Sequence, residues 1–185
     1  MIRLILALVV FVSFAFTANE KSAITAPPTV YKFKVEDLDG KTIDFSKYKG
    51  KKILIVNTAS KCGYTKQYED LEKLYQQYKS KLVIIGFPAN NFGGQEPGTN
   101  AEIKEFCTGT FNVTFPMAAK ISVKGDDMHP LYQFLTQKNK NGLQDSEVEW
   151  NFQKYLLDEN GHLVKVLSPR VLPTDDAIVL WINGK

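Results

Sequence analysis

The sequence predicts an α/β fold in which an N-terminal β-hairpin precedes a parallel strand–helix–strand unit. Continuous apolar runs at residues 52–57 and 82–87 have the pattern of strands buried on both faces. Between them, large residues recur at intervals of three and four over residues 64–78, which predicts an amphipathic helix. A unit of this kind has a right-handed crossover, so both strands end at the same edge of the sheet.

The remaining elements flank this unit within one domain. Residues 31–38 alternate between apolar and polar side chains and are followed by Asp39-Gly40 and a second short run at 42–45, which predicts a hairpin. Residues 174–185 predict a terminal helix whose apolar side closes the core. A chain of 185 residues with 44% hydrophobic residues suits a single globular domain.

The first residues have the order of a secretory signal peptide. One cation, Arg3, precedes an unbroken apolar run at 4–16, and small residues follow. We expect a signal peptide at 1–18, a linker at 19–30 and the domain at 31–185, and hence an exported protein, periplasmic or secreted. The apolar run is shorter than the roughly 20 residues that span a bilayer, so we expect no stable membrane insertion. An uncleaved N-terminal anchor is the alternative.

The charge pattern argues against a nucleic-acid partner. The net charge is +3, and lysines alternate with acidic residues along the chain instead of forming a basic stripe. His129 and His162 are isolated and have no metal-ligand spacing around them, so we expect neither a metal site nor another cofactor.

Cys62 follows the first buried strand, at the point where the helix begins. Open α/β sheets place their sites beyond the carboxyl ends of the strands. The amino end of a following helix favours a thiolate there. A small buried apolar residue is the ordinary alternative for a lone cysteine, but Ser60, Lys61 and Gly63 make the surroundings polar and flexible. The position therefore indicates a reactive thiol.

The second cysteine, Cys107, belongs to a short predicted helix. Thr99 and Glu102 have the spacing of a capping box, and Gly109 is expected to end the helix after barely two turns. A disulfide requires the two α-carbons to approach within about 7 Å, and unwinding such a marginal helix would allow it. Two cysteines in an exported chain also fit a permanent structural disulfide, so a redox cycle and a structural bond both remain open.

Four successive motifs resemble those of the glutathione peroxidase family: NTASKCGYTKQY, GFPANNFGGQEPG, FPMAAKISVKG and WNFQKYLLDENG. The resemblance extends from about residue 31 to the end of the chain. It implies a thioredoxin-like fold, with a central mixed β-sheet flanked by helices. It also implies a thiol peroxidase that reduces hydrogen peroxide and organic hydroperoxides to water and alcohols in the response to oxidative stress.

The resemblance assigns roles to five residues. Cys62 matches the peroxidatic position, and Gln95, Trp150 and Asn151 match the other members of the catalytic tetrad. Cys107 matches the resolving cysteine of the non-animal, thioredoxin-dependent members. The resemblance thus implies a Cys62 sulfenic acid and then a Cys62–Cys107 disulfide, which a thioredoxin-like protein reduces.

Departures from the family pattern narrow these expectations. Ala89 stands where many relatives have a further cysteine, which leaves Cys107 as the only candidate resolver, and Asn91 stands where glutamine is usual. The short segment at 130–150 is similar to that of members without the tetramer-forming loop, which favours a monomer. No set of cationic residues matches glutathione binding, so a thioredoxin-like reductant is favoured over glutathione.

Two other classes of function remain as alternatives. A redox sensor or disulfide oxidoreductase could use the same fold, although CGYT stands where such enzymes have Cys-x-x-Cys. A non-enzymatic binding domain with a structural disulfide is the second alternative. Resistance of the disulfide to thioredoxin would favour the binding domain.

Overall fold

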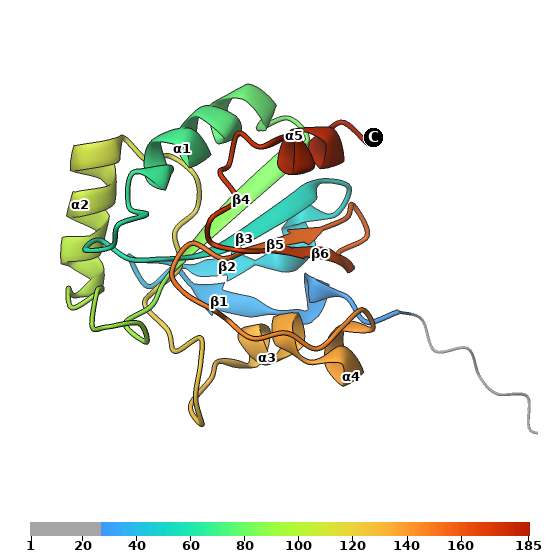
Figure 1. Ribbon diagram of the computed structural model, residues 1–185, viewed down its shortest axis with the longest axis horizontal. Coiled ribbons are helices and arrows are strands. Elements are labelled where there is room, and N and C mark those ends of the chain that lie inside the picture. The colour runs from blue at the N-terminus through green and yellow to red at the C-terminus, as the bar shows by residue number, and fades with distance from the viewer. Residues whose placement is uncertain (1–26) are drawn as a thin grey trace, which may run out of the picture.

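The computed structural model describes residues 27–185, so the predicted signal peptide and most of the predicted linker lie outside the described residues. Its main sheet has the strand order β4-β3-β5-β6 (Figure 1). The central pair, β3 (Lys52–Thr58) and β4 (Leu82–Pro88), is parallel, as the sequence predicts. The strands β5 (Lys154–Leu157) and β6 (Leu163–Leu167) continue the sheet in antiparallel fashion. The expected mixed sheet is therefore present.

The N-terminal hairpin is confirmed, with shorter strands than predicted. It consists of β1 (Lys34–Glu36) and β2 (Thr42–Asp44), flanked by the short 3-10 helices η1 (Val30–Lys32) and η2 (Phe45–Tyr48). The Asp37 carboxylate accepts hydrogen bonds from the amides of Asp39 and Lys41 and so closes the turn. The strands are short because this turn takes up the residues that the alternating pattern assigned to them.

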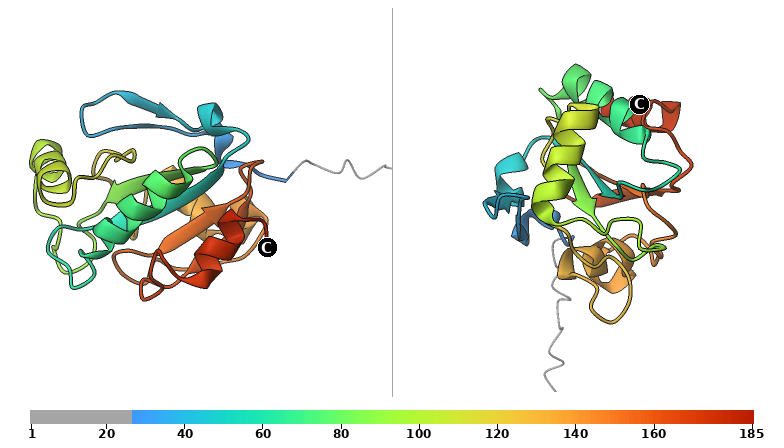
Figure 2. Two further views of the ribbon diagram at one scale, coloured as in Figure 1. Left: turned by 90° about the horizontal axis from the view of Figure 1, so that it is seen from above. Right: turned by 90° about the vertical axis from the view of Figure 1, so that its left-hand side faces the viewer.

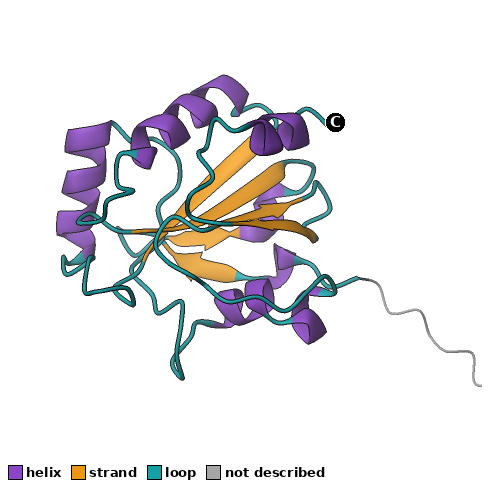
Figure 3. Cartoon of the chain, in the orientation of Figure 1, coloured by secondary structure: helices purple, strands orange, loops and turns teal. Residues whose placement is uncertain are grey.

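Five helices cover the sheet: α1 (Gln67–Tyr78), α2 (Asn100–Phe111), α3 (Pro130–Thr136), α4 (Lys138–Asn141) and α5 (Asp176–Ile182). Figures 1 and 2 show α1 and α5 over one face of the sheet and α3 and α4 over the other. The alternation of helical and strand layers is plain when the chain is coloured by secondary structure (Figure 3). Within residues 27–185, no helix has both the length and the apolar character to cross a bilayer.

The continuous apolar strands are explained by two cores, one on each face of the sheet. Leu54 and Val56 pack toward α1 and α5, whereas Ile53 and Ile55 pack toward α3 and the hairpin. Because successive side chains of a strand point to opposite faces, a strand covered on both sides must be apolar throughout.

Helix α5 is shorter at both ends than the predicted 174–185, and two other helix boundaries, near the cysteines, differ from the sequence prediction. Helix α1 begins at Gln67 instead of residue 64, because residues 59–66 form the loop that carries Cys62. Helix α2 has 12 residues and passes through Gly109. It ends at Asn112, whose left-handed backbone (φ 51°) lets its amide bond to the carbonyls of Cys107 and Thr108.

Candidate active site

Cys62 lies in the loop between β3 and α1, at the predicted edge of the sheet. Thr65 shapes this loop: its hydroxyl accepts a hydrogen bond from the Cys62 amide (3.0 Å) and donates one to the Ala59 carbonyl (2.9 Å). The amide of Tyr64 points at Cys62 Sγ from 3.4 Å. Cys62 is half-buried, and the loop places the Tyr64 amide as a hydrogen-bond donor at its sulfur.

Gln95 and Asn151 are brought together from two distant loops. The Asn151 side-chain amide donates to Gln95 Oε1 at 2.9 Å, and the backbone carbonyl of Gln95 accepts from the Lys61 amide at 3.0 Å. The second bond ties Gln95 to the residue before Cys62. Because Asn151 already occupies the acceptor oxygen of Gln95, the group that remains for a ligand is the Nε2 donor.

Asn57, near the end of β3, holds the turn that carries Trp150 and Asn151 through two hydrogen bonds. The Asn57 side-chain amide donates to the Trp150 carbonyl (3.0 Å), and the backbone carbonyl of Asn57 accepts from the Phe152 amide (2.6 Å). Phe152 has φ 68°, a left-handed conformation that costs about 1–2 kcal/mol in a non-glycine residue. The contacts around the turn therefore hold Phe152 in this conformation and offset its cost.

Trp150 is one of the exposed large side chains of the molecule. It is 38% exposed, and its ring packs against Phe92 with the centroids 5.3 Å apart. Cavities of about 320 Å³ and 310 Å³ open on either side of the Cys62 loop, one beside Tyr64 and Trp150 and the other beside Ser60 and Glu96. The site is therefore open to solvent and offers an aromatic surface for an apolar substituent.

Lys154 also holds the same turn, and no sequence signal pointed to it. Its side chain is fully buried, and Nζ donates to the Phe152 carbonyl at 2.7 Å. Burial lowers the pKa of Lys154 to about 7. A lysine in a strand is usually a surface residue, so the sequence alone does not reveal that Lys154 is buried.

Glu96 is a second residue that the sequence analysis missed. It is fully buried; its Oε1 accepts a hydrogen bond from the Ser60 hydroxyl (2.6 Å), and its amide donates to Asn90 Oδ1 (2.9 Å). Burial raises the pKa of the Glu96 carboxyl. Ser60 lies two residues before Cys62, so Glu96 anchors the loop that presents the thiol. Its position directly after Gln95 in the GGQEPG motif was the sequence feature that could have identified it.

Cys107 lies on α2 in a very different environment. It is 1% exposed, and burial raises the pKa of its thiol to about 11. The hydroxyl of Tyr68, from α1, lies beside the sulfur. The expected capping box is present, with Thr99 and Glu102 each bonding to the other's backbone amide. Cys62 and Cys107 are both free cysteines in this structure.

A further cavity lies away from Cys62. It has a volume of about 520 Å³ and runs between the β1–β2 hairpin and α2, where Cys107 forms part of its wall. Cys62, Gln95, Trp150 and Asn151 do not line it. The structure thus brings together Gln95 and Asn151 near Cys62 and places Cys107 in a separate, buried setting.

Asn91, which stands where glutamine is usual, forms hydrogen bonds to a neighbouring loop. The Asn91 amide donates to the Ser122 hydroxyl and the Lys124 carbonyl, both at 2.9 Å, and its oxygen accepts from the Val123 amide. Asparagine at this position therefore holds a neighbouring loop in place.

No group of three or more histidine, cysteine, aspartate or glutamate side chains with the geometry of a metal site occurs within residues 27–185.

Comparison with known proteins identifies the family of the chain. Residues 30–136 match the family model described as glutathione peroxidase. The chain is 46% identical over 146 residues to a glutathione peroxidase homolog of Staphylococcus epidermidis, covering 78% of this chain and 92% of that protein. It is 47% identical over 156 residues to a glutathione peroxidase-like peroxiredoxin of Schizosaccharomyces pombe, covering 81% of this chain and 98% of that protein.

Solved structures extend the comparison. The structure of T. cruzi GPX1 superposes with a TM-score of 0.65 at 34% identity, covering 84% of this chain and 97% of that one. A thiol:disulfide interchange protein of the thioredoxin family from Chlorobium tepidum superposes with a TM-score of 0.61 at 18% identity, over 86% of this chain and 99% of that one, which shows the thioredoxin-like fold alone. The chain belongs to the glutathione peroxidase family and is a glutathione peroxidase-like peroxidase.

Proposed function

We propose that the enzyme reduces hydroperoxides through a two-cysteine cycle in which Cys62 is the peroxidatic and Cys107 the resolving residue. The observation that carries this proposal is the contrast between a half-buried Cys62 beside the Gln95–Asn151 pair and a fully buried, unpaired Cys107. Gln95, Trp150 and Asn151 complete the catalytic site. The electron donor is a thioredoxin-like protein, with glutathione as the less favoured donor.

In the first step, the Cys62 thiolate attacks one oxygen of the hydroperoxide. The S–O bond forms as the O–O bond breaks, so the sulfur is oxidised to a sulfenic acid and the peroxide is reduced to an alcohol or water. The departing oxygen carries the developing negative charge and takes up a proton from solvent. Donors placed at that oxygen lower the barrier, a role that suits the Nε2 of Gln95 and the indole N–H of Trp150.

In the second step, the Cys107 sulfur attacks the sulfenic sulfur of Cys62. A disulfide forms, hydroxide leaves, and the proton of the Cys107 thiol completes the water molecule. A thiol with a pKa of about 11 and 1% exposure is unreactive in place. We therefore expect α2 to open before this step, because a 12-residue helix depends on packing for its stability.

The sequence of the first 18 residues supports a place outside the cytoplasm, with an uncleaved anchor as the alternative. Oxidising compartments keep disulfides closed, so an exported enzyme of this kind requires a dedicated thioredoxin-like reductant in the same compartment. Recovery of the mature protein from the cytosol would remove this requirement.

The test is a single-turnover experiment on the fully reduced protein. One equivalent of hydrogen peroxide is added, free thiols are alkylated, and intact mass and peptide maps are recorded for wild type, Cys62→Ser and Cys107→Ser. We expect a Cys62–Cys107 disulfide in wild type, sulfenic or overoxidised Cys62 in Cys107→Ser, and no oxidation in Cys62→Ser. Oxidation of Cys62 without a bond to Cys107 would show that an external thiol such as glutathione resolves it. An unreactive Cys62 would refute the proposal.

A further inference from the structure

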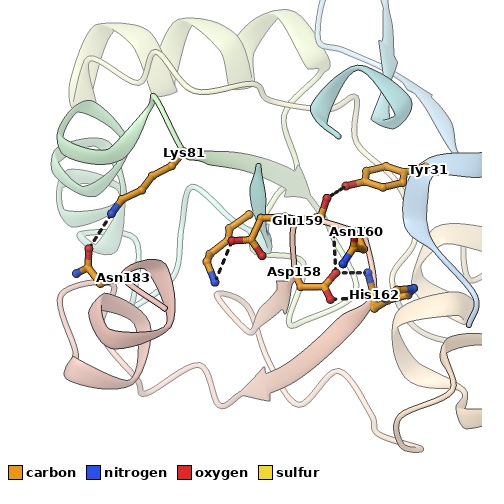
Figure 4. A network of polar contacts seen from close by, with 8 residues as sticks. Tyr31, Lys81, Asp158, Glu159, Asn160, His162 and Asn183 are labelled. Atoms are coloured by element: carbon orange, nitrogen blue, oxygen red, sulfur yellow. Dashed lines mark hydrogen bonds and ion pairs between the residues drawn. The ribbon is translucent and has the colours of Figure 1, made fainter. Parts of the chain in front are cut away.

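Lysines that are far apart in the sequence lie together where β3 and β4 begin, at the end of the sheet opposite to Cys62. Lys51 Nζ donates to the Lys79 carbonyl at 3.0 Å. Lys81 Nζ donates at 2.8 Å to Oδ1 of Asn183, two residues before the end of the chain, as Figure 4 shows. We call this region the lysine end. Its cationic side chains are Lys49, Lys51, Lys52, Lys79, Lys81, Lys165 and Lys185, and its acidic side chains are Asp158 and Glu159.

The lysine end concentrates positive charge that the molecule as a whole lacks. Residues 27–185 contain 21 lysines and arginines and 19 aspartates and glutamates. Subtracting the seven lysines and two acids of the lysine end leaves 14 cationic and 17 acidic side chains elsewhere. The lysine end therefore has a side-chain charge of +5, whereas the rest of the described chain has −3. Alternation of charges along the sequence conceals this separation, because the fold sorts them in space.

Aromatic rings accompany three of these lysines. Lys52 Nζ lies 5.3 Å from the centre of the Trp181 ring, Lys81 Nζ lies 5.3 Å from that of Tyr78, and Lys49 Nζ lies 5.6 Å from that of Tyr31. Lysine paired with tryptophan or tyrosine is typical of protein surfaces at the level of lipid headgroups, where amphipathic rings and long cationic side chains are both favourable.

A shallow cavity of about 470 Å³ opens at the same place. Lys52, Lys165 and Lys185 contribute its charges, and Leu180 and Val164, which are 46% and 40% exposed, contribute apolar surface. Lys52 forms an ion pair with Glu159 (3.4 Å), and Asp158 is the other carboxylate nearby. Most of the cations of the lysine end therefore have no carboxylate partner. A cationic rim around exposed apolar side chains matches an anionic headgroup and the hydrocarbon next to it.

The chain also enters the domain at this end. The Val30 amide donates to the Gly161 carbonyl (2.9 Å), and the Tyr31 hydroxyl donates to the Glu159 carbonyl (2.6 Å), as Figure 4 shows for Tyr31. In Figure 1 the described chain begins on the same side as the C-terminus and opposite to α2. The apolar run of the sequence ends at residue 16, and the chain from there to residue 27 can span at most about 40 Å. The run can therefore reach a bilayer on which the lysine end rests.

We propose that the lysine end is a docking surface for an anionic lipid membrane. The lysines contact the headgroups, the aromatic rings and Leu180 lie at their level, and the Cys62 end faces away into the aqueous compartment. The enzyme then works beside a membrane while its reactive thiol stays accessible to soluble hydroperoxides and to a protein reductant.

The test is co-sedimentation of the full chain with vesicles of 70% phosphatidylcholine and 30% phosphatidylglycerol, compared with pure phosphatidylcholine vesicles. The apolar run binds neutral and anionic vesicles alike. The ratio of the affinity for anionic vesicles to that for neutral vesicles therefore excludes its contribution. The test variant carries Lys49→Gln, Lys79→Gln and Lys81→Gln. A matched control carries Lys41→Gln, Lys66→Gln and Lys124→Gln, three exposed lysines elsewhere. Peroxidase activity toward hydrogen peroxide is measured on bound and free protein.

We expect wild type to prefer anionic vesicles and the test variant to lose about 100-fold of that preference, since each lysine near an anionic surface strengthens binding about fivefold. The control variant should keep the preference to within about threefold, because its lysines point away from the membrane. Activity should be the same on bound and free protein. Equal binding to both vesicle types, an equal loss in the control variant, or loss of activity on binding would overturn the proposal. Equally tight binding to soluble polyglutamate would assign the surface to an acidic protein instead.

Discussion

The two cysteines are held in opposite ways. Cys62 lies in a loop, is half-buried, and has an amide donor 3.4 Å from its sulfur. Cys107 lies on a helix, is 1% exposed, and has a pKa of about 11. The first thiol can react where it stands, whereas the second must leave its environment. The difference suggests that the structure separates oxidation from resolution by making the second step depend on an opening of α2.

The contacts that hold the Cys62 region differ from those that hold the Cys107 helix. The Cys62 region is held by the bond of Asn57 to the Trp150 carbonyl and by the Gln95–Asn151 bond, which join segments far apart in the sequence. The bond of Lys154 to the Phe152 carbonyl adds a local contact in the same turn. The Cys107 helix has local caps at both ends, the Thr99–Glu102 capping box and Asn112, and otherwise depends on packing of Ile103 and Cys107 against the core. Local contacts contribute about 1 kcal/mol each and can be lost without unfolding the sheet.

The largest expected effect tests whether the two cysteines divide the work. Cys107→Ser should leave the rate of Cys62 oxidation within about twofold of wild type, because Cys107 takes no part in that step. Steady-state turnover with thioredoxin should fall at least about 100-fold, because the sulfenic acid is then resolved only by slow side reactions. Stopped-flow tryptophan fluorescence and a coupled thioredoxin assay measure the two rates. Unchanged turnover would mean that the donor attacks Cys62 directly.

The second prediction concerns the support of Cys62. Asn151→Ala removes the hydrogen bond to Gln95 Oε1 and frees the Gln95 amide to rotate. Loss of one positioned donor from a site of developing negative charge typically lowers the rate about 100-fold. We expect that loss in Cys62 oxidation alone. Disulfide formation from pre-oxidised protein should keep its wild-type rate, and a matching loss in that second step would show that Asn151 supports the whole domain.

The third prediction uses the buried Lys154 beneath the same turn. Its pKa of about 7 in the folded protein lies below the unfolded value of about 10.4, so the unfolded state binds more protons between these values. The free energy of unfolding should therefore rise between pH 7 and pH 9, by about 2 kcal/mol. Below pH 7 Lys154 is protonated in both states and its contribution to the slope vanishes.

Urea unfolding of wild type and Lys154→Met at pH 7, 8 and 9 measures this slope, with Lys138→Met as the exposed control. Cys107 and the buried tyrosines have raised pKa values and act in the opposite direction once the unfolded-state groups ionise, from about pH 8.5 for Cys107. Because this contribution is common to wild type and both variants, the difference between their slopes reports Lys154 alone. We expect the slope to disappear in Lys154→Met and to persist in Lys138→Met. An unchanged slope in Lys154→Met would mean that Lys154 keeps its proton in the folded state.

Much of the site could be predicted because its reactive residues follow recognisable local signals. The apolar runs located the ends of two buried strands, and the motif around Cys62 lies at one of those ends. The capping box of α2 was likewise readable from Thr99 and Glu102 alone. These features depend on residues that are close in the sequence, where spacing and geometry are directly linked.

The supporting residues could not be predicted, because their roles depend on partners far along the chain. Asn57 bonds to a carbonyl 93 residues away, and Ser60 bonds to Glu96 36 residues away. The end of α2 was wrong for a related reason: Gly109 lies in open space, with no contact that would stop the helix, and Asn112 supplies the cap instead. The concentration of charge at the lysine end was also invisible until the strands were placed side by side.

The smallest expected effect is also the most direct test of the comparison between the two cysteines. Thr99→Ala removes the cap of α2 and should destabilise the helix by about 1 kcal/mol. Gly109→Ala should stabilise it by a similar amount, because the glycine is in the helix interior and an added Cβ meets nothing within 4 Å. If opening of α2 limits disulfide formation, the first change accelerates that step about fivefold and the second slows it about fivefold. Cys62 oxidation should be unaffected by both, as rapid-quench mass spectrometry can measure. Opposite shifts would establish helix opening as the gate, whereas equal rates in the two variants would mean that Cys107 reaches Cys62 without unwinding α2.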